Sequence, residues 1–299
     1  MRLVTTATII ALAAGVATAG VAAPAQAQAE PEGPRLRWDD DWARGHPATW
    51  VVMTSAAAGA LVFRSLYEPG SEALLREPTA LDTAVRDHVM APDAEDRERA
   101  SRISDVLLTG LILWPFVDSL LVAGAGDQNS DVAWQLFTVA VEALAADYAL
   151  SSIVKVFVHR NRPHAERCSL EDRRLRPGRC GTEGRTMSFY SGHSSAAFNS
   201  AFVTCITHAY LPIYGSDAAD AFACGTSLVL ATTVAALRVI ADRHHATDVM
   251  LGAVSGALTG LLLPYLLHFG WDPVEGEADA MTAPLRGATP VMFSAGGTF

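Results

Sequence analysis

Six long apolar stretches follow the first 46 residues, and no other feature constrains the fold of this chain as strongly. Each is rich in Ala and Leu and lacks the strict alternation of apolar and polar residues expected of a half-buried strand. Runs of this length and pattern are typical of helices. The sequence therefore predicts an all-α fold, a bundle of about six core helices. The stretches cover residues 47–63, 106–124, 132–154, 194–213, 221–240 and 249–269.

The remaining segments give the expected domain organisation. The first segment combines an early Arg2, an apolar run and a small-x-small site at Ala25–Ala27, as in a secretory signal peptide. An uncleaved membrane anchor is the alternative, and in either case we expect an exported or membrane-inserted protein. The expected parts are a signal peptide (1–29), a polar leader (30–46), a helical domain (47–271) and an irregular C-terminal tail (272–299).

The composition excludes some classes of protein. The formal net charge is −10 at pH 7, and nucleic-acid binding normally requires a basic face, so we expect no nucleic-acid partner. Half of the residues are apolar and 18% are charged. This is less charge than soluble enzymes usually carry and more than a dense multi-span transporter carries.

Charged residues inside the apolar stretches leave the number of membrane spans open. Several stretches approach the roughly 20 residues that a span needs. Asp118, Glu142 and Asp147 lie within the second and third stretches, and such charges are costly in lipid unless they face the bundle interior. We expect Glu142 and Asp147 to be buried polar partners, and His208 and His268 to be hydrogen-bonded structural histidines. Membrane association is favoured, with a soluble periplasmic bundle as the alternative.

The four cysteines form no C-x-x-C pair, so a zinc site or a thioredoxin-like motif is not expected. In an oxidising compartment, Cys168 and Cys180 could close a short loop as a disulfide. Cys205 and Cys224 could meet across a helical hairpin, or could be two buried free thiols.

Two short blocks at predicted helix ends carry residues suited to binding an anion. Lys155 and Arg162 lie seven residues apart, which is two helical turns, so both side chains can point the same way. Ser191, Gly192 and His193 open the fourth stretch. A helix start rich in Ser and Gly presents free backbone N–H groups, a ready site for an anion.

A third block leads from the fifth stretch into the sixth and contains Arg238, His244 and Asp248. His244 and Asp248 are four residues apart, so the carboxylate can hydrogen-bond one ring nitrogen and orient the other. In an up-and-down bundle all three blocks share one end, and the active site is expected there.

The converged residues match the needs of phosphoryl transfer. Cations can hold the equatorial oxygens of phosphate, one histidine can attack phosphorus, and the other can protonate the leaving oxygen. Lys and Arg can neutralise the charge that magnesium would otherwise handle. We therefore expect neither a metal nor a cofactor.

The three blocks resemble the Lys-x6-Arg-Pro, Pro-Ser-Gly-His and Ser-Arg-x5-His-x3-Asp signature of the type 2 phosphatidic acid phosphatase superfamily. That superfamily includes bacterial class A acid phosphatases and vanadium haloperoxidases. The order and the spacings agree, and the resemblance covers roughly residues 100 to 270. Tyr190 replaces the usual proline and Leu237 the usual serine, which bears on substrate preference more than on activity.

The resemblance implies a role for each matching residue. Lys155, Arg162 and Arg238 would hold phosphate, assisted by Ser191 and the Gly192 backbone. His193 would be the general acid, His244 the nucleophile and Asp248 its orienting partner.

Other residues near the blocks have a weaker claim to the site. His245 is an alternative ring to His244, but only His244 has an aspartate four residues later. His159, His164 and Arg185 are more typical of solvated loop residues than of substrate contacts.

We therefore expect a metal-independent phosphatase that acts on lipid phosphate monoesters or diphosphates, of the phosphatidic acid or polyprenyl diphosphate class, through a phospho-histidine intermediate. Apolar helices around the site would admit a lipid tail. The site would face the periplasm from a bacterial inner membrane. A soluble, broad-specificity periplasmic acid phosphatase is one alternative, and a vanadate-dependent haloperoxidase is another. A membrane scaffold or transporter would require the Lys, Arg, His and Asp matches to be accidental.

Overall fold

The computed structural model describes residues 35–66, 75, 77–166 and 186–270. No strand forms in these ranges, where isolated β-bridges join Leu75 to Arg160 and Arg160 to Met187. The predicted all-α fold is confirmed. The predicted signal peptide and C-terminal tail, the Cys168–Cys180 disulfide and Arg185 lie outside the described residues.

The six predicted apolar stretches correspond to six long helices. Within the described residues these are α2 (Pro47–Leu66), α4 (Ala94–Val117), α5 (Ser130–Val158), α7 (Gly192–Tyr210), α8 (Asp217–Ile240) and α9 (Ala246–Ala257), and a shorter helix, α3 (Ala80–Val89), precedes α4. Wider, π-helical turns prolong α4 through η1 (Asp118–Gly126) and α9 through η4 (Leu258–Leu262) and η5 (Tyr265–Phe269). The short 3-10 helix η2 (Pro163–Glu166) follows α5.

The acidic segment before the second stretch also folds into helices. Thr79 caps α3 by accepting a hydrogen bond from the Asp82 backbone N–H, and the Asp82 carboxylate accepts one from the Thr79 N–H in return. This reciprocal pair satisfies two backbone donors at the start of α3. The charged residues that follow form the first turns of α4, which begins at Ala94.

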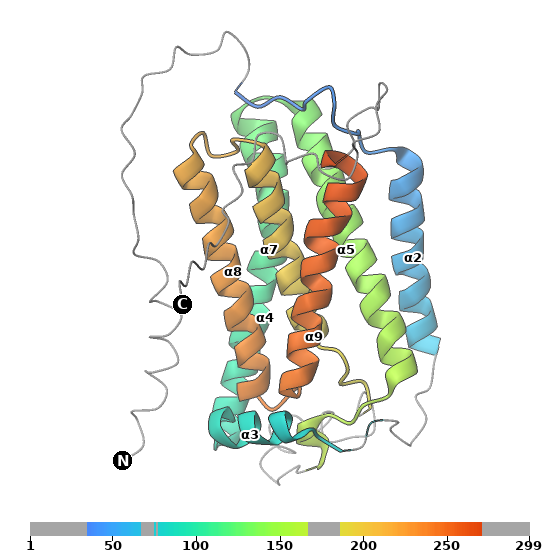
Figure 1. Cartoon of the computed structure of the whole chain (residues 1–299), viewed down its shortest axis with the longest axis vertical. Coiled ribbons are helices and arrows are strands. Elements are labelled where there is room, and N and C mark those ends of the chain that lie inside the picture. The colour runs from blue at the N-terminus through green and yellow to red at the C-terminus, as the bar shows by residue number, and fades with distance from the viewer. Residues whose placement is uncertain (1–34, 67–74, 76, 167–185, 271–299) are drawn as a thin grey trace, which may run out of the picture. The chain divides into compact units, whose positions relative to one another are not determined.

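Helix α7 lies at the centre of the bundle (Figure 1). Helices α4, α5, α8 and α9 pack around it, whereas α2 packs against α5. Many of the buried residues of α7 are small and polar, such as Ser195, Asn199 and Thr204. The central helix is therefore held by hydrogen bonds to its neighbours as well as by apolar packing.

Glycines on one face of α9 and η4 bring that helix into backbone contact with α7. A Cβ added to Gly256 would lie 2.0 Å from the carbonyl oxygen of Ser195, and one added to Gly260 would lie 2.2 Å from that of Asn199. Any side chain at these positions would push the helices apart. Small residues commonly permit such close approach between apolar helices.

The carboxylates inside the apolar stretches are all buried, and each has a polar partner within the bundle. Asp118 lies 3.2 Å from His208 Nε2, Glu142 lies 2.9 Å from His268 Nε2, and Asp147 accepts the Ser195 hydroxyl. These contacts confirm the predicted structural roles of the two histidines, and the expectation that Glu142 and Asp147 have buried polar partners.

Cys205 and Cys224 form a disulfide that joins α7 to α8. The sequence left open whether this pair forms a disulfide or two buried free thiols, and the structure has the disulfide.

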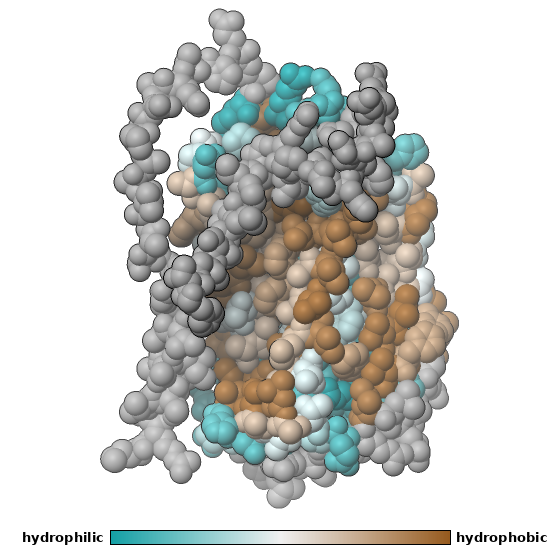
Figure 2. Space-filling model, viewed as in Figure 1, coloured by the Kyte–Doolittle hydropathy of each residue, from teal (hydrophilic) through white to brown (hydrophobic). Residues whose placement is uncertain are grey.

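In the described part of the chain, five helical segments are long and apolar enough to cross a membrane: Pro47–Leu66, Ala94–Gly126, Ser130–Val158, Asp217–Ile240 and Ala246–Phe269. Their outward faces carry exposed large apolar side chains, including Val52, Leu121, Phe157 and Phe222. On the side in view, Figure 2 shows a broad hydrophobic area along the flank of the helices, with hydrophilic residues gathered toward the helix ends.

Candidate active site

The three blocks meet at one end of the bundle, where α5 and α8 end and α7 and α9 begin. Lys155 lies in the last turn of α5, Arg238 in the last turn of α8 and His193 in the first turn of α7. Arg162 follows α5, and His244 lies in the loop that leads to α9. All five side chains line one cavity of about 560 Å³.

The same cavity has an apolar wall. It is formed by α4 and α5 through Ile112, Phe116, Val141, Leu144 and Ala145. The cavity therefore joins a cluster of basic and imidazole groups to a surface that water wets poorly. This combination suits an amphiphilic ligand with an anionic head.

The tautomer of His244 follows from a single contact. His244 is buried, and its Nδ1 lies 2.9 Å from the carbonyl oxygen of Ser188. A carbonyl oxygen only accepts, so Nδ1 must carry the hydrogen. In the neutral ring Nε2 then has the lone pair, and it is the nitrogen available for attack.

Asp248 supports His244 in a different way from the one its spacing suggests. Its carboxylate lies 3.8 Å from His244 Nδ1, beyond hydrogen-bond distance. Helix α9 begins only at Ala246, so His244 is not on the helix and the rule for residues four apart does not apply. Asp248 instead accepts hydrogen bonds from the Ser188 hydroxyl at 2.5 Å and the His245 N–H at 3.1 Å. It thereby fixes both segments that hold the His244 ring.

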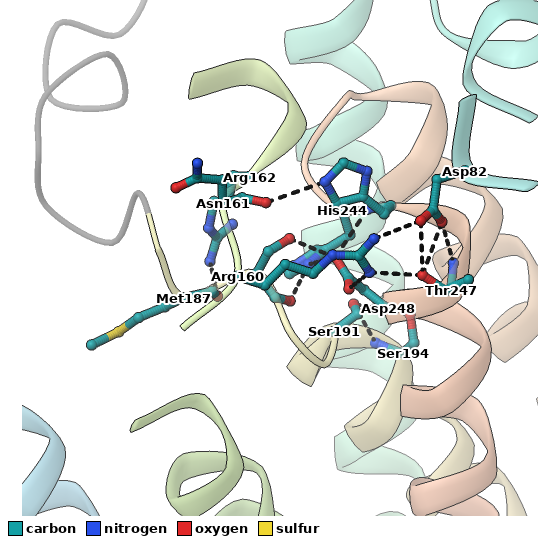
Figure 3. Close-up of polar contacts among 12 residues, drawn as sticks. Asp82, Arg160, Asn161, Arg162, Met187, Ser191, Ser194, His244, Thr247 and Asp248 are labelled. Atoms are coloured by element: carbon teal, nitrogen blue, oxygen red, sulfur yellow. Dashed lines mark hydrogen bonds and ion pairs between the residues drawn. The ribbon is translucent and has the colours of Figure 1, made fainter. Parts of the chain in front are cut away.

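A buried ion-pair chain lies behind this loop (Figure 3). Arg160 donates to Asp248 and to Asp82 of α3, each at 2.5 Å, and to the Thr247 hydroxyl at 2.7 Å. Asp82 also accepts from the Thr247 N–H at 2.9 Å. All three charged side chains are almost fully buried. Helix α3 is thus tied to the start of α9 and, through Asp248, to the loop of His244.

Asp105 of α4 joins the two sides of the cavity. It accepts a hydrogen bond from His193 Nε2 at 2.8 Å and another from Arg238 at 3.1 Å. Arg238 also donates to the Ser104 hydroxyl at 3.0 Å. The carboxylate therefore contacts both the expected general acid, His193, and an expected phosphate-binding cation, Arg238.

Lys155 contacts a residue of its own helix and the segment that leads into α7. Its Nζ donates to the Ser151 hydroxyl at 2.5 Å and lies 5.4 Å from the ring centroid of Tyr190. A cation at this distance from an aromatic face is attracted by the ring. A Cβ on Gly192 would lie 3.0 Å from the same Nζ. Tyr190, a departure from the usual pattern, thus contributes a contact to the site.

Ser191 lies behind the cavity wall and does not line it. It is the N-cap of α7, where its hydroxyl accepts from the Ser194 N–H at 3.3 Å. Its own N–H donates to the backbone carbonyl of Asp248 at 3.0 Å. Ser191 therefore holds the start of α7 against α9, and Gly192 and His193 are the residues of that block that reach the cavity.

His245 turns away from the cavity that His244 lines. Its Nε2 lies 3.2 Å from the carbonyl oxygen of Asn161. His164 contacts the carbonyl oxygen of Asp242 at 3.1 Å, and His159 ends α5 with a left-handed backbone conformation. None of these three rings is among the residues that line the cavity in the described part of the chain.

The electrostatics of the loop keep His244 neutral. Burial lowers the pKa of His244 well below its ordinary 6.5; the Asp248 carboxylate opposes this shift, and Arg162 and Arg238 add to it. Burial alone would raise the pKa of Asp82. The N–H groups of Thr247 and Thr79 and the Arg160 guanidinium overcome that effect and hold it well below its ordinary 3.8.

Asp105, Asp82 and Arg160 were missed by the reasoning from sequence. Asp105 and Asp82 lie in the charged segment before the family blocks, where no spacing distinguishes them from other acidic residues. Arg160 lies inside the first block, between the two cations that the resemblance assigns. Within the described residues, no group of three or more His, Cys, Asp or Glu side chains is arranged to hold a metal ion.

Comparison with known proteins agrees with the resemblance seen in the motifs. Residues 136–271 match the family model of the PAP2 superfamily, and this span contains all three blocks. Neither the curated proteins nor the solved structures gave a match. Residues 136–271, which contribute most of the residues that line the cavity, therefore match the PAP2 superfamily, and this match supports phosphatase activity on phosphate esters.

Proposed function

We propose that this chain is a metal-independent phosphatase that hydrolyses lipid phosphates through a phospho-histidine intermediate on His244. The observation that carries the proposal is the state of that ring. The Ser188 carbonyl occupies Nδ1, which leaves Nε2 with the lone pair in a ring that lines a cavity with Lys155, Arg162 and Arg238.

In the first step, the lone pair of His244 Nε2 attacks phosphorus and a nitrogen–phosphorus bond forms. The bond from phosphorus to the ester oxygen breaks, and its electron pair goes to that oxygen. Lys155, Arg162 and Arg238 stabilise the charge on the equatorial oxygens. In the second step, water attacks the phospho-histidine, which releases inorganic phosphate and restores neutral His244.

His193 would move the proton in both steps. The Asp105 carboxylate accepts from Nε2 of His193, so this nitrogen carries a hydrogen. In the protonated ring Nδ1 carries the second hydrogen, and we assign that proton to the leaving oxygen in the first step, which leaves a neutral imidazole with Nε2–H still bonded to Asp105. The ring, having lost it, would accept a proton from the attacking water in the second step. General acid–base catalysis of this kind contributes about 100- to 10,000-fold in rate.

Two observations favour a lipid over a soluble phosphate ester. The cavity has an apolar wall on α4 and α5, next to its basic residues. Five segments have the length and composition of membrane spans, and their outward faces expose large apolar side chains. Soluble proteins rarely expose apolar areas of this extent. A membrane protein would admit the lipid tail along the apolar wall while the phosphate enters the basic end.

The test is phosphate release from phosphatidic acid, a polyprenyl diphosphate and p-nitrophenyl phosphate by the purified full chain in detergent with EDTA. The wild type is compared with His244→Ala and with His88→Ala, a matched change of an exposed histidine on α3. We expect release by the wild type and by His88→Ala. In His244→Ala it should fall by on the order of 1,000-fold or more, because the nucleophile is lost.

The intermediate can be trapped separately. Rapid quenching of labelled substrate should give an acid-labile, alkali-stable phosphoprotein in the wild type and none in His244→Ala. If neither protein releases phosphate, and vanadate with peroxide supports bromide oxidation instead, the phosphatase proposal is wrong. Preference for p-nitrophenyl phosphate over both lipids would support the soluble-substrate alternative.

A further inference from the structure

The cavity contains a fourth basic side chain that belongs to none of the three blocks. Arg64 lies in the last turn of α2, a helix outside the region that matches the PAP2 family. It lines the same cavity as Lys155, Arg162 and Arg238. The three block cations have an assigned task, the oxygens of the transferred phosphate, whereas Arg64 has none.

Arg64 is half-buried, and its surroundings differ from those of the buried arginines Arg160 and Arg238. It is the one charged residue of α2, whose other residues are apolar or uncharged. Arg160 and Arg238 are each paired with a carboxylate. Among the described residues, Arg64 has no hydrogen bond or ion pair. Arg64 lies near the end of α2, where a guanidinium can reach water as well as the cavity. The cavity that it lines is where an anion would bind.

The charge and the size of the cavity exceed the needs of one phosphate group. Four cationic side chains line it in the described structure, and Asp147 is the one carboxylate that does so. The volume of about 560 Å³ is in the range that accommodates a ligand much larger than a phosphate ion. Both quantities leave room for a second anionic group beside the first.

The arrangement of the helices indicates where that group would lie. Helix α2 packs against α5, which carries Lys155. Arg238 comes from α8, which packs on α7 and α4. Arg64 therefore approaches the cavity from the α5 side, and Figure 1 shows α2 beside α5 at the edge of the bundle. A second phosphate would lie between Arg64 and the group held by Lys155.

We infer that Arg64 binds the non-transferred phosphate of a diphosphate lipid, and that it makes the enzyme selective for diphosphates over monophosphates. This inference rests on the proposed phosphatase function. His244 Nε2 would bond to the terminal phosphorus, and the bond from that phosphorus to the bridging oxygen would break. The electron pair passes to the bridging oxygen, which becomes a terminal oxygen of the departing lipid monophosphate. Arg64 stabilises the charge that this group gains.

The test compares two substrates that differ by one phosphate, farnesyl diphosphate and farnesyl monophosphate, on the full chain in phospholipid-free detergent. Arg64→Gln removes the charge, Arg64→Lys retains it, and Arg99→Gln changes an exposed arginine of α4 as a matched control. We expect Arg64→Gln to lower kcat/KM for the diphosphate about tenfold or more, as for loss of a hydrogen bond to a charged group. For the monophosphate, kcat/KM should change by less than about threefold, because this substrate has no second phosphate for Arg64 to bind. Arg64→Lys should restore part of the diphosphate activity, and Arg99→Gln should match the wild type.

Each other outcome has a clear meaning. If the wild type cleaves both substrates and Arg64→Gln leaves their ratio unchanged, the inference about Arg64 is wrong while the proposed function stands. Arg64→Gln could instead lower activity only in phospholipid vesicles, and equally for both substrates. That result would mean that Arg64 binds a membrane headgroup, and it would overturn the inference about Arg64. If the wild type cleaves neither substrate, nor any of the phosphate esters named above, the proposed function itself fails.

Discussion

The carboxylate of Asp105 accepts a hydrogen bond from His193 Nε2 at a distance of 2.8 Å. Asp105 belongs to α4, before the region that matches the PAP2 family, and His193 begins α7 within it. The geometry of the proposed general acid therefore depends on a helix that the family motifs do not include.

We predict that Asp105→Asn lowers kcat for the preferred lipid phosphate about tenfold, as expected when a general acid is misplaced but retained. The amide cannot balance the charge of Arg238, and its NH₂ group can turn toward His193. The Asp105 side chain is 44% exposed, so the variant should fold. Kinetics across pH provide the measurement, with Asp96→Asn on the exposed part of the same helix as the control. An unchanged kcat and pH profile would remove Asp105 from the mechanism.

The ion-pair chain from Asp82 through Arg160 to Asp248 should stabilise the site end of the bundle. Removing one partner of a buried pair typically costs about 3–5 kcal/mol. We therefore expect Asp82→Ala to lower Tm in detergent by several degrees and to reduce activity. Asp87→Ala, on an exposed position of the same helix, should leave both unchanged. Equal Tm values for the two variants would show that α3 does not support the His244 loop.

The depressed pKa of His244 predicts activity that persists into mildly acidic solution. Burial is the main cause of the depression, so the free enzyme should keep its neutral nucleophile well below pH 6.5. The midpoint of the acid limb of kcat/KM should therefore lie below 6.5. A midpoint at or above 6.5 would contradict a neutral, buried His244.

The same shift predicts how stability changes with pH. Below pH 6.5 the unfolded chain protonates this histidine while the folded chain does not, so folding stability should decrease as pH falls through that window. Asp82 adds a second loss below its ordinary value of 3.8, because it too stays deprotonated only in the folded state. Tm measured from pH 8 to pH 3 should show both decreases. The first should be smaller in His244→Gln but not absent, because burial also lowers the pKa of His193, to about 4.

The disulfide between Cys205 and Cys224 should stabilise the chain without affecting the chemistry. It closes a loop with a sequence separation of 19 residues, for which the expected contribution is about 3 kcal/mol. The double variant Cys205→Ser/Cys224→Ser should therefore unfold at a lower temperature and retain wild-type kcat at 25 °C. A loss of kcat in the folded double variant would show that the far part of the α7–α8 pair influences the site.

Most of the fold could be predicted because its signal is repeated along the chain. Each apolar stretch has enough residues to reveal helical structure, and helices that alternate in direction necessarily bring their ends together. The family blocks then located Lys155, Arg162, His193, Arg238 and His244, all of which line the cavity.

The remaining parts could not be predicted because they depend on single contacts between distant segments. Asp82 and Arg160 are 78 residues apart, and neither has a local pattern that marks it as a partner of the other. The predicted hydrogen bond between Asp248 and His244 does not form, for a related reason. The spacing rule assumes one continuous helix, and α9 starts two residues after His244.

Because α2 lies at the edge of the bundle, the choice of substrate and the chemistry of the reaction depend on different helices. The groups proposed for catalysis and phosphate binding come from α5 and the segment after it, from α7 and α8, and from the loop before α9. Helix α2 packs against α5 and lies outside the family region. Substituting residues along this one helix could therefore change which headgroups are accepted while the reaction centre stays intact. The substrate range of such a chain can therefore be engineered by substitutions on this peripheral helix.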